Sequence, residues 1–394
     1  MAQIVQIQKF FTAIIAGLVA ALLPAAAQAG NVILFVGDGM GLAQREAARL
    51  AAHGPDGRLA MDQLEYLSLV TTHAANALTT DSAAGATAWS AGRKTNNKFL
   101  AVDPEGASLR TILEQARDAG YGTGLVTSST LTHATPAAFA AHVEDRGSEA
   151  LIAEQMLESR AQVMLGGGRI FWIPASRPGS KRQDERDLTA EARAAGYAVV
   201  QSAAELEALE LHKTRHLLGL FAEGQMSYVY DRQGKAEPEL ATMTRAALEV
   251  LKHAERGFFL MVEGGRIDHA CHNNDATRAI WETIALDQAV AAGIEYARRD
   301  GNTLVILVAD HETGGMSVGT ACYQPLPQIP RSGGFPDRSA QLDSLLCIGW
   351  TTKSHTAIPV IAGALGPGAE QFRGTMDNTA LFPIMVEALG LESD

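Results

Sequence analysis

The chain has 394 residues, 47% of them hydrophobic and 19% charged, and its formal net charge is -12. This composition is typical of a folded globular protein, and the acidic excess excludes a general nucleic-acid or anionic-membrane binder, which needs a Lys/Arg-rich surface. An anionic substrate is not excluded, because bound metal ions can invert the field inside one cleft.

The first 29 residues have the pattern of a secretory signal peptide. Lys9 and the amino terminus form a positive n-region, Phe10 to Leu23 forms an apolar h-region, and Ala27-Gln28-Ala29 fits the small-x-small cleavage rule. Cleavage would remove Lys9, so a mature chain starting at Gly30 would have 31 basic against 44 acidic residues, or -13. An uncleaved membrane anchor is the alternative, but the apolar stretch is short for one. We expect a periplasmic or secreted protein, with no later segment apolar for long enough to span a bilayer.

Short apolar runs alternate with helical patterns along the rest of the chain. Strands are expected at 32–36, 124–127, 162–165, 258–262, 303–308 and 357–362, and helices at 82–91, 108–119, 149–159, 239–253, 279–299 and 378–388. Because the strands are continuous apolar runs, we expect burial on both of their faces. This order predicts an α/β fold: a three-layer α/β/α sandwich with a mostly parallel central sheet.

Two segments interrupt the alternation. Residues 169–188 are rich in Pro, Arg, Lys and Asp, and residues 320–352 carry four prolines and little periodicity. Both are interpreted as surface insertions, the second as a lobe over one end of the sheet. We expect residues 30–394 to form one domain with these insertions rather than two independent domains.

The three cysteines are Cys271, Cys322 and Cys347. Export makes a disulfide possible, and Cys322 and Cys347 are the plausible pair because they bracket a loop-rich stretch. Cys271 would then be an odd, packed thiol. The sequence alone does not establish this connectivity.

The helix expected at 82–91 follows Thr79-Thr80-Asp81 and begins with small residues. Thr80 or Asp81 can cap it, which places Ser82 in the first turn, where free N–H groups and the helix dipole favour an anion. A serine hydroxyl needs a base or a metal to become a nucleophile, and the Gly-x-Ser-x-Gly elbow of α/β-hydrolases is absent. Ser82 is therefore a candidate metal-activated nucleophile; the alternative is a buried helix of small residues without chemistry.

Arg146 is a candidate anion clamp downstream of this helix. A guanidinium group can hold two oxygen atoms of a phosphate group at once. Taken alone, Arg146 is better explained as a surface arginine.

Three apolar runs end in acidic residues. The first runs into Asp38, the second into Glu263, and the third into Asp310 and His311. In open α/β sheets, ligands bind outside the carboxyl ends of the strands, so parallel strands would bring these groups into one crevice. One such acid is easily a helix cap or turn residue, but three together would repel unless metal ions neutralised them.

Histidines follow at spacings that suit metal binding. Asp268 and His272 are four residues apart, which puts them on one face of a helical turn, and His355 precedes a late strand. Mixed Asp/His sets favour Zn²⁺, whereas oxygen-only sets favour Mg²⁺. Four other histidines, His53, His212, His216 and His253, are assigned no role.

Several motifs together resemble alkaline phosphatase. They are Asp-Gly-Met-Gly at 38–41, Thr-Asp-Ser-Ala-Ala at 80–84, His-Ala-Thr-Pro-Ala at 133–137, Val-Glu-Gly-Gly-x-Ile-Asp at 262–268, Ala-Asp-His-Glu at 309–312 and Ser-His-Thr at 354–356. Each is moderately specific, but they occur in the family's order from residue 31 to the C-terminus. The resemblance implies an alkaline phosphatase-like catalytic domain over residues 30–394.

The resemblance also implies a role for each matched residue. It implies one zinc site of Asp268, His272 and His355, a second of Asp310, His311 and Asp38, and a Mg²⁺ site of Asp38, Thr135 and Glu263. Ser82 would attack a phosphate monoester to form a phosphoserine, and Arg146 would hold the non-bridging oxygens. Hydrolysis of the phosphoserine would release inorganic phosphate.

Two positions depart from a common bacterial pattern. His133 stands where many bacterial members have Asp, and His269 stands where many have Lys, a combination that resembles the animal enzymes. Because a neutral histidine lacks the fixed charge of lysine, we hypothesise faster phosphate release and a more alkaline optimum. A nitrogen at His133 could favour Zn²⁺ or Co²⁺ over Mg²⁺ in the third site.

Two alternatives stay open. Phosphodiesterases, sulfatases and mutases of the same superfamily usually carry Thr or a modified Cys or Ser as nucleophile, so Ser82 and Arg146 favour the monoesterase. A non-catalytic zinc- or phosphate-binding protein is the alternative from another class. The family is commonly dimeric, so a homodimer is expected, although the mature chain starts too close to the first strand for an N-terminal arm. The sequence does not indicate the physiological substrate.

Overall fold

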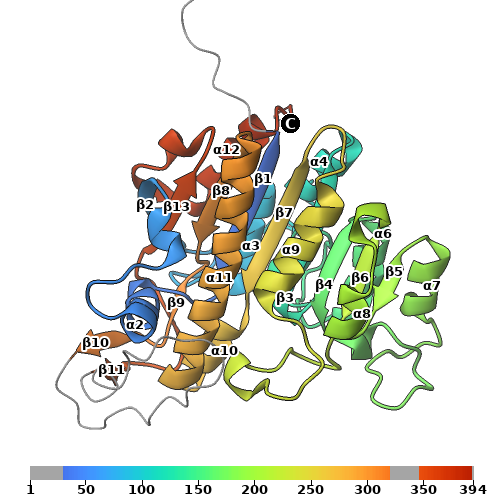
Figure 1. Cartoon of the computed structure of the whole chain (residues 1–394), viewed down its shortest axis with the longest axis horizontal. Helices are drawn as coiled ribbons and strands as arrows, with labels where there is room; N and C mark the ends of the chain where they lie inside the picture. Colours follow the sequence, from blue (N-terminus) through green and yellow to red (C-terminus); the bar gives the residue numbers. More distant parts are fainter. Residues whose placement is uncertain (1–29, 320–345, 393–394) are drawn as a thin grey trace, which may run out of the picture.

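A ten-stranded sheet forms the centre of the molecule (Figure 1), in a computed structural model that describes residues 30–319 and 346–392. The strand order is β14-β2-β13-β8-β1-β7-β3-β4-β6-β5. The sheet strands are β1 (Asn31–Gly37), β2 (Tyr66–Thr71), β3 (Gly122–Thr130), β4 (Val163–Gly167), β5 (Ala198–Val200), β6 (Leu217–Leu220), β7 (Phe258–Gly264), β8 (Thr303–Val308), β13 (Val360–Leu365) and β14 (Gly374–Asp377). Two small ribbons pair β10 (Ser317–Gly319) with β11 (Cys347–Gly349) and β9 (Glu312–Thr313) with β12 (His355–Thr356).

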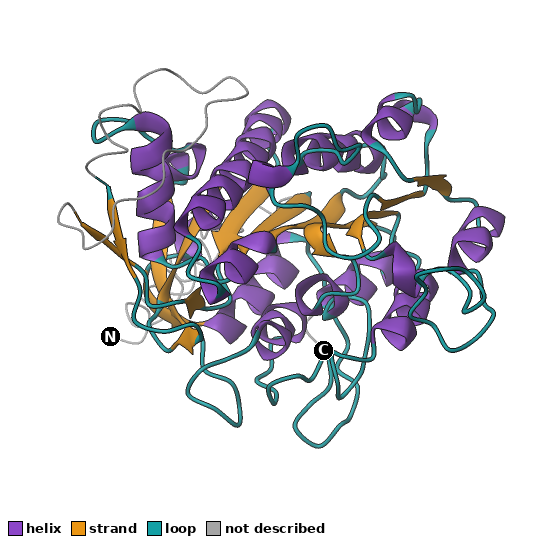
Figure 2. Cartoon of the chain, turned by 90° about the horizontal axis from the view of Figure 1, so that it is seen from below, coloured by secondary structure: helices purple, strands orange, loops and turns teal. Residues whose placement is uncertain are grey.

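Helices cover both faces of the sheet, which confirms the predicted three-layer α/β/α sandwich (Figure 2). In Figure 1, α9 and α11 lie in front of the sheet, and α3 and α4 lie behind it. The helices are α2 (Leu42–His53), α3 (Ser82–Ala91), α4 (Ile112–Asp118), α5 (Ala134–Ala137), α6 (Glu149–Glu158), α7 (Leu188–Ala194), α8 (Ala203–Glu207), α9 (Leu240–Leu251), α10 (Arg266–His272), α11 (Ala276–Asp300) and α12 (Leu381–Ala388).

The central strands are parallel and buried on both faces. β1 pairs in parallel with β7 and β8, and β3 pairs in parallel with β7 and β4. Every residue of β1, β3, β7 and β8 is buried, as continuous apolar runs require. The four adjacent strands β8, β1, β7 and β3 therefore present their carboxyl ends side by side.

One predicted strand was placed incorrectly. The apolar run expected at 357–362 forms β13 at Val360–Leu365, and it is antiparallel to both of its neighbours. Pro359 precedes the strand, and because proline has no N–H to donate to a sheet ladder, the strand begins only after it.

The segment 169–188 is a surface loop that is fastened to the body of the protein. The side chain of Arg182 is 1% exposed and contacts Glu154 and Asp184, while its guanidinium also donates to the carbonyls of Ala150 and Phe171. A buried, fully paired arginine explains how a Pro- and charge-rich segment packs in one conformation.

Other predictions fall partly or wholly outside the described residues. These are the signal peptide at 1–29 and most of the segment 320–352. Cys271 is a free, buried thiol, as expected, and Cys347 takes part in a disulfide. Cys322, its predicted partner, lies outside the described residues, so that pairing stays a prediction.

Candidate active site

The predicted acidic residues meet at the carboxyl ends of adjacent strands. Asp38 follows β1, Glu263 lies near the end of β7, and Asp310 and His311 follow β8. All four side chains are buried. Gly39 makes the close approach possible: its φ is +69°, and a Cβ there would lie 2.8 Å from Asp268 Oδ1.

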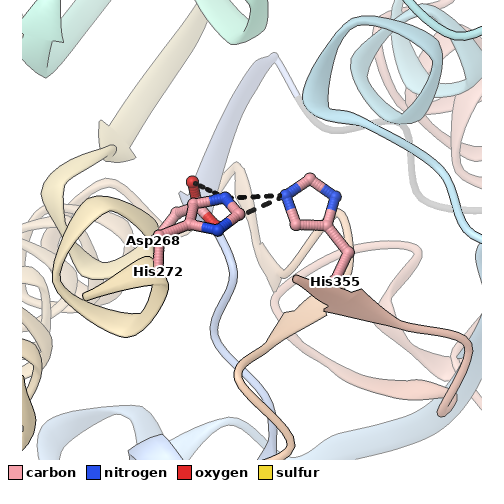
Figure 3. Close-up of side chains that lie close together, drawn as sticks. All are labelled: Asp268, His272 and His355. Atoms are coloured by element: carbon pink, nitrogen blue, oxygen red, sulfur yellow. Dashed lines mark hydrogen bonds and ion pairs between the residues drawn. The ribbon is translucent and has the colours of Figure 1, made fainter. Parts of the chain in front are cut away.

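Asp268, His272 and His355 form a first donor cluster, although α10 and β12 are far apart in sequence (Figure 3). His272 Nε2 lies 3.2 Å from Asp268 Oδ2, and His355 Nε2 lies 3.6 Å from Asp268 Oδ1. The two Nε2 atoms are 3.1 Å apart. Two imidazole nitrogens and a carboxylate therefore converge on one point.

Backbone carbonyls orient both rings of this cluster. His272 Nδ1 lies 2.6 Å from the carbonyl of Lys353, and His355 Nδ1 lies 2.8 Å from that of Thr80. A ring that donates from Nδ1 turns the lone pair of Nε2 inward, which is the arrangement of metal-ligating histidines. The hydrogen bond with Asp268 raises the pKa of His272 to about 9, so in this cluster a proton and a metal ion would compete for Nε2.

A second cluster surrounds His311. Its Nε2 lies 3.0 Å from Asp310 Oδ2 and 3.8 Å from Asp38 Oδ1. Asp310 Oδ1 accepts backbone N–H groups from Gly39 and His311. Asp268 belongs to this cluster as well, because one of its oxygens lies within 4.8 Å of donor atoms of Asp38 and His311.

The first two clusters adjoin each other. The rings of His311 and His355 stack with centroids 3.5 Å apart. The Thr313 hydroxyl lies 2.5 Å from Asp268 Oδ1 and 3.2 Å from His311 Nδ1. Two cations held here would be close neighbours.

A third cluster joins Asp38, His133 and Glu263. His133 Nδ1 lies 3.8 Å from Asp38 Oδ2 and 3.7 Å from Glu263 Oε1. The other oxygen of Glu263 accepts a hydrogen bond from the Thr127 hydroxyl. Thr135 lies on α5 and is buried. The structure thus brings the ring of His133 into the set that the resemblance had assigned to oxygen ligands alone.

Buried donor atoms in the second and third clusters have no hydrogen-bond partner among the described residues. They are Asp38 Oδ2, His133 Nδ1, Thr135 Oγ1 and Glu263 Oε1, whereas Asp310 Oδ2 and His311 Nε2 face each other as an ion pair. Unpaired polar atoms are costly to bury, so such a set needs ligands. Burial and the negative charges of Asp310, Asp268 and Glu263 raise the pKa of Asp38 well above its usual range. Cations would relieve both penalties, and the donor types fit Zn²⁺ and Mg²⁺.

Ser82 is the first residue of α3 and is buried beside Asp38. Its Oγ lies 3.4 Å from Asp38 Oδ1. Asp81 caps the helix by accepting the N–H of Ala84, which confirms one of the two predicted caps. The hydroxyl therefore lies at a positive helix end and at the edge of the acidic clusters.

Arg146 connects the helix cap to the third cluster. One guanidinium nitrogen lies 3.1 Å from Asp81 Oδ2, and the other lies 3.1 Å from His133 Nε2. Asp81 also accepts the N–H of Lys98. Arg146 is thus held between His133 and Asp81, the residue before Ser82, rather than free on the surface, where the isolated sequence had favoured it.

The ring of His269 packs edge-on against the ring of His133, with ring centroids 5.3 Å apart. Arg266 lies 2.9 Å from its Nδ1, so Nδ1 accepts and the ring hydrogen is on Nε2. Burial, the neighbouring His133 and the charge of Arg266 lower the pKa of His269 to about 3. The ring is neutral, as the hypothesis about phosphate release requires.

Sequence reasoning missed a buried carboxylate that supports the site. Glu312 accepts hydrogen bonds from Gln44, from the Thr356 hydroxyl and from the N–H groups of Gly315 and Met316. Glu312 was part of a quoted motif but received no role. The two side-chain partners, Gln44 and Thr356, are distant in sequence, and only the position next to His311 could have indicated the importance of Glu312.

Comparisons with known proteins agree with this geometry. Residues 29–330 match the family model of alkaline phosphatase. The chain is 38% identical to streptomycin-6-phosphate phosphatase of Streptomyces griseus, over 93% of this chain and 91% of that protein. It is 36% identical to alkaline phosphatase of Escherichia coli (strain K12), over 92% of this chain and 87% of that protein.

Solved structures give the same result. The alkaline phosphatase of Thermus thermophilus superposes with a TM-score of 0.82 at 32% identity, covering 94% of this chain and 93% of that one. A variant of the alkaline phosphatase of the Antarctic bacterium TAB5, with Asp in place of a histidine, has a TM-score of 0.80 at 30% identity, covering 93% and 100%, and holds Mg in its M3 site.

One structural finding bears on the membrane. Within residues 30–319 and 346–392, none of the helices has the length and apolar character that crossing a bilayer requires.

The matches cover nearly the whole chain, and the predicted clusters meet where the family's motifs lie. The chain therefore belongs to the alkaline phosphatase family and is a phosphomonoester hydrolase.

Proposed function

We propose that this chain is an exported alkaline phosphatase that hydrolyses phosphate monoesters through a phosphoserine at Ser82, in a site with two Zn²⁺ and one Mg²⁺. The observation that carries the proposal is the convergence of three donor clusters beside Ser82, with four buried donor atoms that lack partners among the described residues. Buried carboxylate, imidazole and hydroxyl groups without protein partners are typical of metal ligands.

The proposed ligand sets are those that the family's motifs imply; the clusters add Asp268 to the second set and His133 to the third. The first zinc site consists of Asp268, His272 and His355, the second of Asp310, His311 and Asp38, and the third site of Asp38, Thr135 and Glu263. The third site differs from the other two because His133 Nδ1 lies 3.8 Å from Asp38 Oδ2 and 3.7 Å from Glu263 Oε1. Nitrogen and oxygen together fit Zn²⁺ or Co²⁺ as well as Mg²⁺. In the Antarctic relative, the variant that holds Mg in its M3 site has Asp in place of a histidine, which supports Mg²⁺ in this family where a carboxylate replaces an imidazole.

Metal ions bound there would supply positive charge that lowers the pKa of the Ser82 hydroxyl and stabilises the departing alkoxide. Ser82 loses its hydroxyl proton to solvent and its oxygen attacks phosphorus. The bond to the leaving oxygen breaks, a phosphoserine forms, and the alkoxide takes a proton from water to leave as the alcohol. Water attacks that phosphoserine, the bond to Ser82 breaks, and Ser82 regains its proton. Asp81 and His133 hold Arg146 within reach of the non-bridging oxygens.

The neutral His269 supports faster phosphate release than a lysine would allow, because it adds no fixed charge beside the product.

We further propose that residues 1–29 are removed on export to the periplasm or beyond. Residues 30–394 would form one catalytic domain, and two copies would form a homodimer. Light scattering of the purified mature protein tests the last point.

Metal analysis tests the proposed site directly. Purified wild-type protein should contain two zinc ions and one magnesium ion per chain, and Asp268→Asn and Asp310→Asn should each lose one zinc. Each substitution removes a charged ligand from a different proposed zinc site and changes the size of the side chain very little. Zinc content at the wild-type level in both variants would refute the assigned ligand sets.

A further inference from the structure

His355 reaches the first cluster on a short segment, residues 351–356. Its β pairing is minimal: β12 aligns only His355 with Thr313 and Thr356 with Glu312 of β9. The N–H groups of Thr351 and Thr352 both donate to the carbonyl of Gly314. Further contacts hold the segment: the N–H of Gly314 donates to the carbonyl of Ser354, and the Thr356 hydroxyl donates to Glu312.

Asn274 makes such a contact from the other side of the cluster. It lies just beyond the end of α10, the helix that carries Asp268 and His272. The end of its side-chain amide lies against the carbonyl oxygens of Cys271 and Thr352, at 3.0 Å and 2.9 Å. Two carbonyl oxygens can only accept, so this position is assigned to the amide nitrogen, which donates to both. One side chain therefore joins the end of α10 to the segment that carries His355.

The backbone of Asn274 is unusual as well. Its φ is +54°, in the left-handed region that residues other than glycine rarely adopt. Asparagine tolerates this region better than most residues. This left-handed backbone conformation follows the end of α10 and turns the chain toward α11. The side-chain amide of Asn274 therefore faces residues 351–356.

The carbonyl next along that segment orients a ligand. Thr352, which Asn274 binds, precedes Lys353, whose carbonyl lies 2.6 Å from His272 Nδ1. Three residues after Thr352 comes His355 itself. The Asn274 amide thus fixes the stretch of backbone that sets both the ring orientation of His272 and the position of His355.

We propose that Asn274 is a positioning residue that fastens residues 351–356 to α10 and so keeps zinc in the first site. The inference rests on the proposed zinc site of Asp268, His272 and His355. Groups that orient ligands commonly change metal affinity by about 10- to 100-fold when they are removed.

Two substitutions separate the amide from the backbone. Asn274→Gly keeps the left-handed conformation without strain and deletes both side-chain hydrogen bonds. Asn274→Asp keeps the size of the side chain but offers the two carbonyls only acceptor oxygens. The matched control is Asn273→Ala, because the Asn273 amide donates to the carbonyl of His269 within the same helix.

The measurement is the rate of zinc release to a coloured chelator from the metal-loaded enzyme, together with the melting temperature of the metal-free protein. In Asn274→Gly and Asn274→Asp, one zinc per chain should leave about 10- to 100-fold faster, while the second zinc and the metal-free melting temperature stay near wild type. Asn273→Ala should release both zinc ions at wild-type rates.

Two results would overturn the role of Asn274. One is release at the wild-type rate from Asn274→Gly while Asp268→Asn lacks one zinc. The other is equal acceleration of both zinc ions with a lowered metal-free melting temperature, which would indicate a general contribution to folding. If Asp268→Asn keeps the full zinc content, the proposed site is wrong and the inference falls with it.

Discussion

Arg146 has two partners in this structure, and both are parts of the proposed site. Asp81 caps the nucleophile helix, and His133 belongs to the third cluster. A phosphate group beside Ser82 would offer the guanidinium two anionic oxygens in place of, or in addition to, these partners. Arg146 is therefore placed to bind a substrate more tightly when its phosphate group carries more negative charge.

Substitution of Arg146 should discriminate between substrate classes. Arg146→Ala should lower kcat/KM for an aryl phosphate monoester by about 100-fold, the effect of two lost charge-assisted hydrogen bonds. The matching diester, which has fewer anionic oxygens, should lose about 10-fold or less. Steady-state kinetics on both substrates check this, and wild type should strongly prefer the monoester. Equal losses, or a wild-type preference for the diester, would remove the assigned role of Arg146.

His269 offers a second test at the scale of one residue. His269→Lys introduces a fixed positive charge beside His133 and should tighten product binding, with a phosphate inhibition constant about 10-fold lower. The pH optimum should move toward lower pH. Phosphate inhibition measured across pH values checks both effects, and an unchanged pH profile would show that His269 does not set the optimum.

The donor residues of the candidate site were largely predictable from the sequence. The residues that hold the donor-bearing segments in place were not. Asp38, Asp268 and His311 follow from acids and histidines at strand ends and from the family's motifs. Glu312 and Asn274 could not be found this way. Their importance depends on contacts with Thr356 and Thr352, and those contacts exist only once the late segment folds back over α10.

At the scale of elements, burial on both faces made the long central strands visible in the sequence, whereas the fully buried but short β6 was missed. β7 and β8 are fully buried, so their residues form unbroken apolar runs. β2 was missed because its pattern is reversed: Leu67 and Leu69 are exposed, whereas Ser68 is buried. A polar residue facing inward and leucines facing outward give no signal of an ordinary half-buried strand.

Helix α11 contains a buried carboxyl that should make stability depend on pH. Glu282 is 2% exposed and accepts the N–H of Val229. Burial raises its pKa from 4.5 to about 7, against the hydrogen bond from Val229 and the charges of Arg232 and Arg266. The unfolded chain therefore loses its proton at lower pH than the folded protein. The stability present below about pH 4.5 is lost as the pH rises toward 7, and it stays lost above that value.

Glu282→Gln should remove the loss of stability that accompanies rising pH, because the amide oxygen still accepts the Val229 N–H and does not ionise. Relative to wild type, the free energy of unfolding of the variant should rise by about 3 kcal/mol between pH 5 and pH 8. Urea denaturation at the two pH values measures the difference. Glu295→Gln, on the exposed side of the same helix, is the control. A difference between Glu282→Gln and wild type that does not change with pH would contradict this account.

At the scale of the whole molecule, an acidic protein carries out chemistry on an anionic substrate. The net charge is -12, and the most deeply buried acids lie in the site itself. The sheet brings four strand ends together, and α3 adds the Ser82 hydroxyl at a positive helix end. Metal ions are the means by which such a crevice would attract phosphate, so removal with a chelator should abolish activity and lower the melting temperature.

The central claim is that Ser82 carries the phosphate during turnover. Acid quenching of the metal-loaded enzyme with an aryl phosphate, followed by peptide mass spectrometry, tests it most directly. The account predicts phosphate on Ser82 in wild type, none in Ser82→Ala, and a loss of kcat in that variant of at least about 1,000-fold. A Ser82→Ala variant that turns over at the wild-type rate, or a phosphate trapped on another residue, would contradict it.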